Sequence, residues 1–208
     1  TLLQANSNGT LTYRGTRNIA GYARDVWVLS NTLVLVAADI EGVYTLDFTQ
    51  YSSPLVMDSL AFDNLIGGYQ ARAYNVIVNN DTAFVAAGEG GLKVLDIENP
   101  YNLQEIGSGW QDIMNNRLVS VRDMWPHGNF LTLACGEDGV YPLIDISDPL
   151  EPDQVYPRIG TPGRALALVV HNDTSYVASG SGGHMQIVTM DGDSRPPQDK
   201  IQAIFPAS

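Results

Sequence analysis

Short runs of alternating apolar and polar residues, separated by turn-forming residues, make up most of the sequence. Between residues 73 and 109 these runs are AYNVIV, TAFVAA, LKVLDI and LQEIGSG, and the segments NND, GEGG and ENPYN separate them. A period of two residues with many β-branched side chains is typical of strands, and Asn-Asp, Gly-Gly and Asn-Pro pairs are typical of turns. The pattern therefore predicts a unit of four successive β-strands, and no segment has a convincing helical period.

This unit occurs four times along the chain. The last glycine of the loop between the second and third strands recurs at intervals of 49, 48 and 44 residues, at Gly42, Gly91, Gly139 and Gly183. A period in the forties, built of short strands and turns, is the signature of propeller blades. We therefore predict an all-β fold, a β-propeller built of four-stranded blades. The blade repeats are expected at about residues 22–65, 71–112, 119–160 and 163–206.

The ends of the sequence carry further candidate strands. GTLTYRGTRNIAG (9–21) resembles the fourth-strand segments that precede the later repeats, so we predict an outer strand within residues 10–20. DKIQAIFPAS (199–208) is another candidate, which gives five outer strands for four sets of first to third strands. We expect one propeller segment that is part of a larger propeller; a closed ring of four blades is the alternative. Because Thr1 stands where an initiating Met is usual, we interpret the sequence as a processed or excised piece.

Three segments carry a resemblance to a known family. AFVAAGEGGLKVLDIENP (83–100), LIDISDPLEP (143–152) and ARDV (23–26) resemble the LVIVD repeat. The first unit keeps Asp47 but lacks the Pro turn of that pattern, and the fourth has Thr189 in place of the Asp. The resemblance implies a β-propeller of bacterial or archaeal secreted and cell-surface proteins, commonly one module of a larger polypeptide. It implies no catalytic residues, because the family shares none.

Composition narrows the classes of partner. The chain has 11 basic and 23 acidic residues, a net charge of −12, which repels nucleic-acid phosphates and anionic lipid surfaces. No apolar segment approaches the roughly 18 residues of a membrane span, and no signal peptide opens the sequence. We therefore expect no nucleic-acid partner and no membrane insertion. The single cysteine, Cys135, lies in a strand-like run and is interpreted as a buried structural residue.

The loops between the second and third strands contain glycines and acids. A phosphate-binding loop would end in Lys-Ser/Thr and lead into a helix, whereas these loops lead into strands, so we interpret the glycines as turn residues. The aligned acids are weak candidates for calcium ligands: Asp39, Glu41, Glu89, Glu137 and Asp138. The fourth loop carries only Ser181. Calcium needs about six to eight converging oxygens, so a solvated acidic rim is the preferred interpretation and no cofactor is expected.

A second set of polar residues begins each first strand. First strands line the central channel of a propeller, so these residues are candidates for its mouth: Arg24, Asp25, Tyr74, Asn75, Arg122 and Asp123. Such side chains could bind a small ligand. Hydrogen bonds and ion pairs between neighbouring blades are the preferred interpretation. The fourth repeat has Leu166-Ala167 at this position and interrupts the set.

Two further kinds of candidate site are weaker. The three histidines show no metal-ligand spacing, and no GxSxG elbow supports a Ser-His-Asp triad. N-glycosylation sequons begin at Asn8, Asn80 and Asn172, the latter two at the same hairpin tip in different repeats. Glycans there would require a secretory route, and Asn-Asp is also simply good turn chemistry.

Together these features favour a non-catalytic, extracellular or cell-surface scaffold or interaction module. Its expected partners are other blades or chains of the same assembly, with a glycan or a surface protein on a disc face or exposed edge. Two alternatives stay open: a propeller-type hydrolase or lyase with its site at the channel mouth, and a cation-dependent adhesive module.

Overall fold

The computed structural model describes residues 1–63, 65, 68–171, 174–180, 184–189 and 203–204, and these residues form strands, turns and loops. Four antiparallel sheets of four strands each follow one another along the chain. The first contains β3 (Asp25–Val28), β4 (Leu33–Ala37), β5 (Val43–Asp47) and β6 (Leu55–Leu60). The second contains β7 (Asn75–Asn79), β8 (Thr82–Ala86), β9 (Leu92–Asp96) and β10 (Gln104–Glu105). The third contains β13 (Asp123–His127), β14 (Phe130–Ala134), β15 (Val140–Asp145) and β16 (Asp153–Gln154), and the fourth β17 (Ala165–His171), β18 (Thr174–Ser179), β19 (His184–Thr189) and β20 (Ala203–Ile204).

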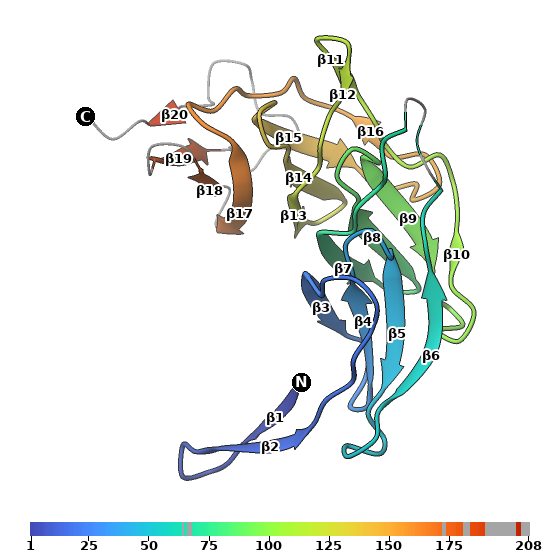
Figure 1. Cartoon of the computed structure of the whole chain (residues 1–208). Helices are drawn as coiled ribbons and strands as arrows, with labels where there is room; N and C mark the ends of the chain where they lie inside the picture. The colour runs from blue at the N-terminus through green and yellow to red at the C-terminus, as the bar shows by residue number, and fades with distance from the viewer. Residues whose placement is uncertain (64, 66–67, 172–173, 181–183, 190–202, 205–208) are drawn as a thin grey trace.

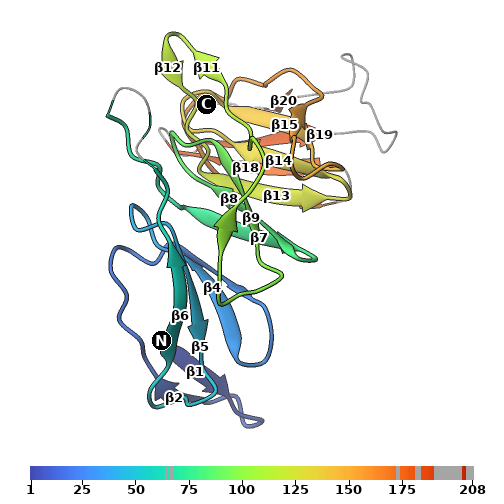
Figure 2. The same cartoon turned by 90° about the vertical axis from the view of Figure 1, so that its right-hand side faces the viewer.

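The sheets are stacked like the blades of a propeller, which confirms the predicted fold class. In every sheet the strands pair in chain order, so each blade is a simple meander. The first strands β3, β7, β13 and β17 lie side by side along the concave side of an arc (Figure 1). The perpendicular view shows the successive sheets one above another (Figure 2). The arc is open between the first and the last sheet (Figure 1), so the blades do not form the closed four-blade ring that we weighed as an alternative.

The hydrophobic core lies between blades rather than within them. One layer joins the first and second sheets through Leu35, Val76 and Val85, and a larger layer joins the second and third sheets. A third layer joins the third and fourth sheets through Ala134 and Leu168. Each inner blade is therefore buried on both faces, because no single sheet can bury its apolar residues alone.

The loop glycines turn the chain where a side chain cannot fit. Gly42, Gly91 and Gly139 have φ values of 76°, 73° and 86°. A Cβ atom on any of them would collide with a backbone carbonyl oxygen of the fourth-strand segment of the same repeat. Glycine adopts positive φ without steric cost, so these loops are hairpin turns between the second and third strands.

Two hairpins were not predicted from the sequence. β11 (Ile113–Met114) and β12 (Arg117–Leu118) form one between the second and third sheets, around Asn115 and Asn116, which both have positive φ. An Asn-Asn pair suits this two-residue turn, but the flanking strands have only two residues each. At the N-terminus β1 (Leu2–Ala5) pairs with β2 (Leu11–Gly15). Of these two, only β2 lies within the outer strand predicted for residues 10–20. None of the described residues belongs to a helix long and apolar enough to span a membrane.

Candidate functional site

The candidate residues gather on the face that carries the loops between second and third strands. Each of these loops touches a residue at the start of the next blade's first strand or two positions before it. Backbone hydrogen bonds run in both directions between Asp39 and Ala73, at 3.1 and 2.9 Å, and between Gly88 and Val121, both at 2.9 Å. Gly136 and Ala165 form the same pair. Loop and channel-mouth residues of neighbouring blades therefore share one surface.

The aspartates at the starts of the first strands bond to the next blade. Oδ2 of Asp25 accepts hydrogen bonds from the backbone N–H of Val76 and from Nδ2 of Asn75, both at 3.0 Å. Oδ2 of Asp123 accepts one from the N–H of Leu168 at 2.8 Å. Burial raises the pKa of Asp123, and the backbone hydrogen bonds partly oppose this shift. These carboxylates cap main-chain donors across blade boundaries.

Three other channel-mouth residues form cation–π contacts, in which the guanidinium groups of Arg24 and Arg122 both lie over the ring of Tyr74. The guanidinium carbon of Arg122 lies 4.4 Å from the ring centroid of Tyr74, and that of Arg24 lies 5.5 Å from the same centroid. Arg24 also lies 5.6 Å from the ring of Tyr22. Both distances to Tyr74 fall within the range of a cation–π interaction, so residues of three successive blades are linked.

Asp39 holds two of the arginines. It is 1% exposed, and its Oδ2 accepts a hydrogen bond from Nε of Arg24 at 2.8 Å, while its Oδ1 accepts one from Arg72 at 3.1 Å. The hydrogen bond to Asp39 raises the pKa of Arg24. Since Arg24 and Arg72 precede different blades, one buried carboxylate connects two of them. Glu41 lies two residues further along the same loop.

The acids of the next two loops are also paired with arginines. Glu89 lies 3.5 Å from Arg122. Asp138, 2% exposed, accepts hydrogen bonds from both terminal nitrogens of Arg117, at 2.8 and 3.0 Å. Burial raises the pKa of Asp138, and Arg117 opposes the shift. Glu137 lies 3.6 Å from Arg117, which belongs to the unpredicted strand β12.

These contacts bear on the calcium hypothesis without testing it. An arginine within ion-pair distance competes with a cation for the same carboxylate oxygens. No three His, Cys, Asp or Glu side chains in the described part of the chain converge in the arrangement that a metal ion needs. Arginine partners are present for the carboxylates of Asp39, Glu89, Glu137 and Asp138. These arginines lie outside the acidic loops, so a search for acidic patterns in the sequence does not find them.

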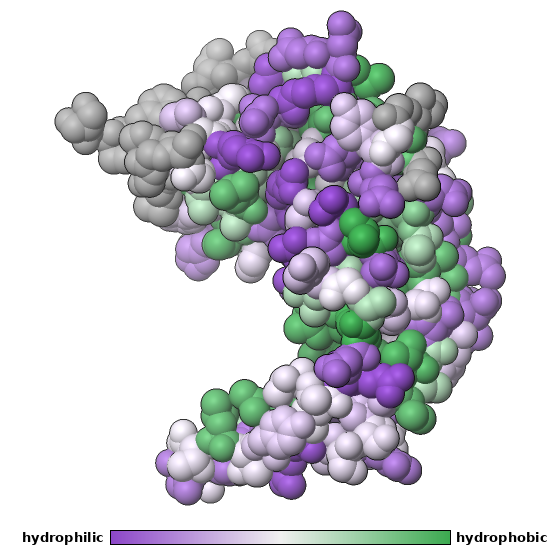
Figure 3. All heavy atoms as spheres, viewed as in Figure 1, coloured by the Kyte–Doolittle hydropathy of each residue, from purple (hydrophilic) through white to green (hydrophobic). Residues whose placement is uncertain are grey.

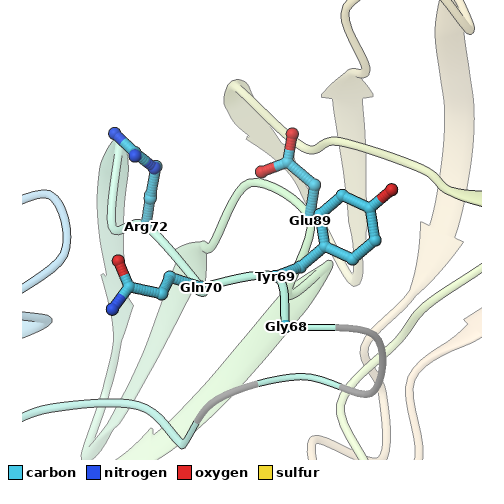
Figure 4. Close-up of a pocket in the computed structure, with 5 residues that line it drawn as sticks. All are labelled: Gly68, Tyr69, Gln70, Arg72 and Glu89. Carbon is cyan, nitrogen blue, oxygen red and sulfur yellow. The ribbon is translucent and has the colours of Figure 1, made fainter.

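A polar pocket of about 540 Å³ lies on this face. It is lined by Gly68, Tyr69, Gln70, Arg72 and Glu89 (Figure 4). In the close-up, the ring of Tyr69 and the carboxylate of Glu89 lie together, and Arg72 and Gln70 extend on the other side (Figure 4). The pocket thus combines a 49% exposed aromatic ring with groups that both donate and accept hydrogen bonds.

The sequence analysis missed the residues before the first strands. The position two residues before the pair that begins each first strand, Arg24-Asp25 in the first repeat, is occupied in three repeats by Tyr22, Arg72 and Arg164. These residues supply ring or ion-pair contacts. Extending the repeat alignment by two residues toward the N-terminus would have shown this aromatic and basic position. Of the three sequons, Asn8 and Asn80 are exposed at the turns of β1–β2 and β7–β8, and Asn172 lies outside the described residues.

Comparison with known proteins confirms the repeat and the fold. The family model of the LVIVD repeat matches residues 70–109, which cover the second sheet. A protein from Lactobacillus plantarum has a TM-score of 0.74 at 12% identity, over 98% of this chain and 61% of that one. The β-propeller domain of Myceliophteria thermophila Cps50 (Swd1) has a TM-score of 0.56 at 14% identity, over 88% of this chain and 56% of that one.

A third similar structure carries an enzyme name. A protein from Bacteroides uniformis, provisionally named a 6-phosphogluconolactonase, has a TM-score of 0.64 at 12% identity, over 94% of this chain and 59% of that one. At such identities the likeness concerns the fold alone. The chain spans about three-fifths of these three structures. No curated protein matches it.

Proposed function

We propose that this β-propeller segment with its LVIVD repeat is a non-catalytic scaffold or interaction module, extracellular or at the cell surface, within a larger protein or assembly. One observation carries the proposal. Charged groups at the channel mouth and on the adjacent loops form bonds across blade boundaries, as Asp25 does with the backbone N–H of Val76 and Asp39 with Arg72. A catalytic carboxylate needs access to a substrate, whereas these support the stack of blades.

The proposal is tested by removing these groups and measuring whether stability or catalytic turnover is lost. Arg24→Ala and Asp25→Ala should lower the unfolding midpoint, and the purified chain should hydrolyse none of a panel of lactones, esters and glycosides. Turnover by the unmodified chain that is lost in Asp123→Asn, with an unchanged unfolding midpoint, would refute the scaffold assignment.

On the loop face we assign recognition of a glycan to the pocket beside Tyr69. A sugar offers an apolar ring face and several hydroxyl groups, which suit an exposed aromatic ring next to amide, guanidinium and carboxylate groups. The chain is applied to a glycan array, together with Tyr69→Ala and the control Tyr101→Ala. Tyr101 is 50% exposed and does not line the pocket. Binding should be lost only in Tyr69→Ala; equal binding by both variants would contradict the assignment.

A second candidate function is a hydrolase or lyase site at the channel mouth. Oδ1 of Asn75 and Nε of Arg122 are buried and lack a hydrogen-bond partner within the described part of the chain. An unpaired acceptor in β7 and an unpaired donor in the residue before β13 are what a small polar ligand could satisfy. The fold resemblance to the provisionally named lactonase makes 6-phosphogluconolactone the first substrate to assay. Turnover that requires both Asn75 and Arg122 would favour this candidate over the scaffold.

The extracellular assignment has its own measurement. Asn8 and Asn80 are exposed at hairpin tips, where an attached glycan would be solvent-exposed. The intact mass of the protein from its native source should exceed the mass of the bare chain by one or more glycans. A mass equal to that of the bare chain would remove the glycosylation hypothesis.

A further inference from the structure

The pocket beside Tyr69 contains a guanidinium group that is only partly engaged. Nη1 of Arg72 donates a hydrogen bond to Oδ1 of Asp39 at 3.1 Å. Within the described part of the chain, Nε and Nη2 of Arg72 have no hydrogen-bond partner. The side chain of Arg72 is 44% exposed and lines the pocket. Its two remaining nitrogens are therefore accessible donors.

These two donors form the edge of the guanidinium group that fits a carboxylate. Nε–H and one N–H of Nη2 are parallel, so the two oxygens of one carboxylate can accept both in a bidentate arrangement. Nη1, which Asp39 engages, lies outside this fork. Asp39 is buried and is also bonded to Arg24, so it holds the guanidinium group of Arg72 in place. A positioned fork is thus presented to the pocket.

The ion pairs around the pocket leave one positive charge uncompensated. Arg24 and Arg72 share the carboxylate of Asp39. Arg122 pairs with Glu89 at 3.5 Å, and cation–π contacts on one ring join this pair to Arg24. The connected network therefore holds three guanidinium groups and two carboxylates. An anion bound at Arg72 would balance it.

This local excess contrasts with the charge of the whole chain. The net charge is −12, so the chain as a whole repels anions. Hydrophilic side chains predominate over the second and third blades in the space-filling view (Figure 3), the blades whose first strands follow Arg72 and Arg122. An anionic ligand is therefore held by short-range contacts at this place rather than by the field of the whole protein.

The other groups of the pocket suit the remainder of a sugar ring. The ring of Tyr69 supplies an exposed apolar face, the carboxylate of Glu89 accepts hydrogen bonds from hydroxyl groups, and Gln70 can donate and accept them. Tyr69 and Glu89 lie together, with Arg72 and Gln70 on the other side (Figure 4). A sugar ring stacked on Tyr69 with hydroxyl groups toward Glu89 therefore directs its opposite substituent to Arg72.

We propose that this pocket recognises a hexuronic acid unit of a glycan, whose carboxylate pairs with the fork of Arg72 and whose ring stacks on Tyr69. The inference rests on the glycan recognition proposed above and names the class of sugar. Tyr69 contributes affinity that neutral and acidic sugars share, and Arg72 selects the acid. A neutral sugar of the same shape therefore binds the same pocket more weakly.

The experiment compares acidic oligosaccharides with their neutral esters on the full chain. Isothermal titration uses oligomers of galacturonic, glucuronic, mannuronic and guluronic acid, each beside its methyl ester, which keeps the sugar skeleton and removes the charge. A chelator is present throughout, so that no divalent cation bridges two carboxylates. At least one acid should bind about tenfold or more tightly than its ester, as expected for a bidentate charge-assisted pair. Equal affinity of every acid and its ester would overturn the inference.

Arg72 and Arg164 give a matched pair of variants, because they hold the same position in the second and fourth repeats. Both are partly exposed and lie beside a loop acid, but only Arg72 lines the pocket. Arg72→Gln should reduce the affinity for the acid to that for the ester and leave the ester unchanged. Arg164→Gln removes the same charge from the same face and should bind like the unmodified chain. Equal weakening by both variants would show a general charge effect and overturn the inference.

Arg72→Lys controls for an effect on folding. Lysine keeps the positive charge beside Asp39 but lacks the fork. This variant should unfold at the same temperature as the unmodified chain and lose most of its preference for the acid over the ester. Undiminished preference in Arg72→Lys would refute recognition by the fork. A sulfated neutral oligosaccharide that binds as tightly as the acid would show that charge alone is recognised, and would also overturn the inference.

The outcomes also separate this inference from the proposed function. Equal binding of acids and esters that is lost in Tyr69→Ala would refute only the uronic acid assignment and leave glycan recognition in place. Binding of neither acids nor esters, nor of any other glycan, would refute both. Lactone turnover together with acid-selective binding would refute the non-catalytic role and leave the uronic acid assignment in place.

Discussion

Removing the carboxylate of Asp25 tests whether the blades are held together by side chains that cap main-chain donors. Asp25→Ala takes the acceptor from the N–H of Val76 and from Nδ2 of Asn75, each 3.0 Å from Oδ2. Val76 is 1% exposed, so its N–H group cannot be rehydrated without opening the blade interface. Asn75 is only half-buried, so water can replace its lost partner in part.

The expected loss follows from these two bonds. A buried donor left without its charged acceptor costs about 2 kcal/mol, and the half-buried amide adds about 1 kcal/mol, which gives about 3 kcal/mol. For a protein of this size 1 kcal/mol corresponds to about 2–4 °C, so the unfolding midpoint should fall by roughly 6–12 °C. Tryptophan fluorescence during heating and during urea titration measures both quantities.

Controls separate this effect from a general loss of charge. Asp148 is exposed and accepts a hydrogen bond only from Leu150 within its own turn, so Asp148→Ala should change stability by about 0.5 kcal/mol or less. Asp25→Asn keeps an oxygen acceptor and should lose less than Asp25→Ala. In a double-mutant cycle with Asn75→Ala, the coupling energy should be about 1 kcal/mol. An Asp25→Ala protein as stable as the Asp148→Ala protein would refute the reasoning.

Three further predictions concern Asp39, Asp123 and the buried Cys135. Asp39 has a φ of 57° at the position where the other repeats have Gly. Asp39→Gly should therefore be more stable than Asp39→Ala by about 1 kcal/mol in urea titration. The reverse order of stability would contradict this argument from backbone strain. Because burial raises the pKa of Asp123 above 3.8, the native state binds a proton more tightly than the unfolded state, so this residue lowers stability as the pH rises through that range. The stability of Asp123→Asn relative to the unmodified chain should therefore increase with pH in urea titrations between about pH 3 and 7; a constant difference would exclude this titration. Burial raises the pKa of the Cys135 thiol, so iodoacetamide should modify it only after denaturation, as read by mass spectrometry.

The fold could be predicted because the repeat amplifies weak local signals. A single strand such as LKVLDI is ambiguous, but the same strand after the same glycine in register defines a hairpin whose geometry only glycine permits at Gly91. β11 and β12 escaped prediction because they occur once and have two residues each, so neither periodicity nor repetition reports them. β1 escaped because its residues, LLQA, show no alternation of apolar and polar side chains.

The candidate site was predictable only in part because its contacts join residues far apart in the sequence. Asp25 and Asn75 could be aligned as a repeated position, yet their hydrogen bond crosses 50 residues of sequence. The arginines that neutralise the acidic loops come from outside the loop pattern: Arg117 belongs to the irregular hairpin, and Arg72 to the segment before β7. An acidic rim and a ring of ion pairs look alike in the sequence, since the difference depends on which blade supplies the cation.

The same contacts give the stack a direction, and the direction explains why its first and last blades are not equivalent. At two of the three described blade boundaries an aspartate at the start of a first strand accepts an N–H of the following blade, Asp25 from Val76 and Asp123 from Leu168, whereas the second blade has Asn75, whose Oδ1 has no partner in the described part of the chain. The fourth blade has Ala167 at this position, so it carries no aspartate of this kind.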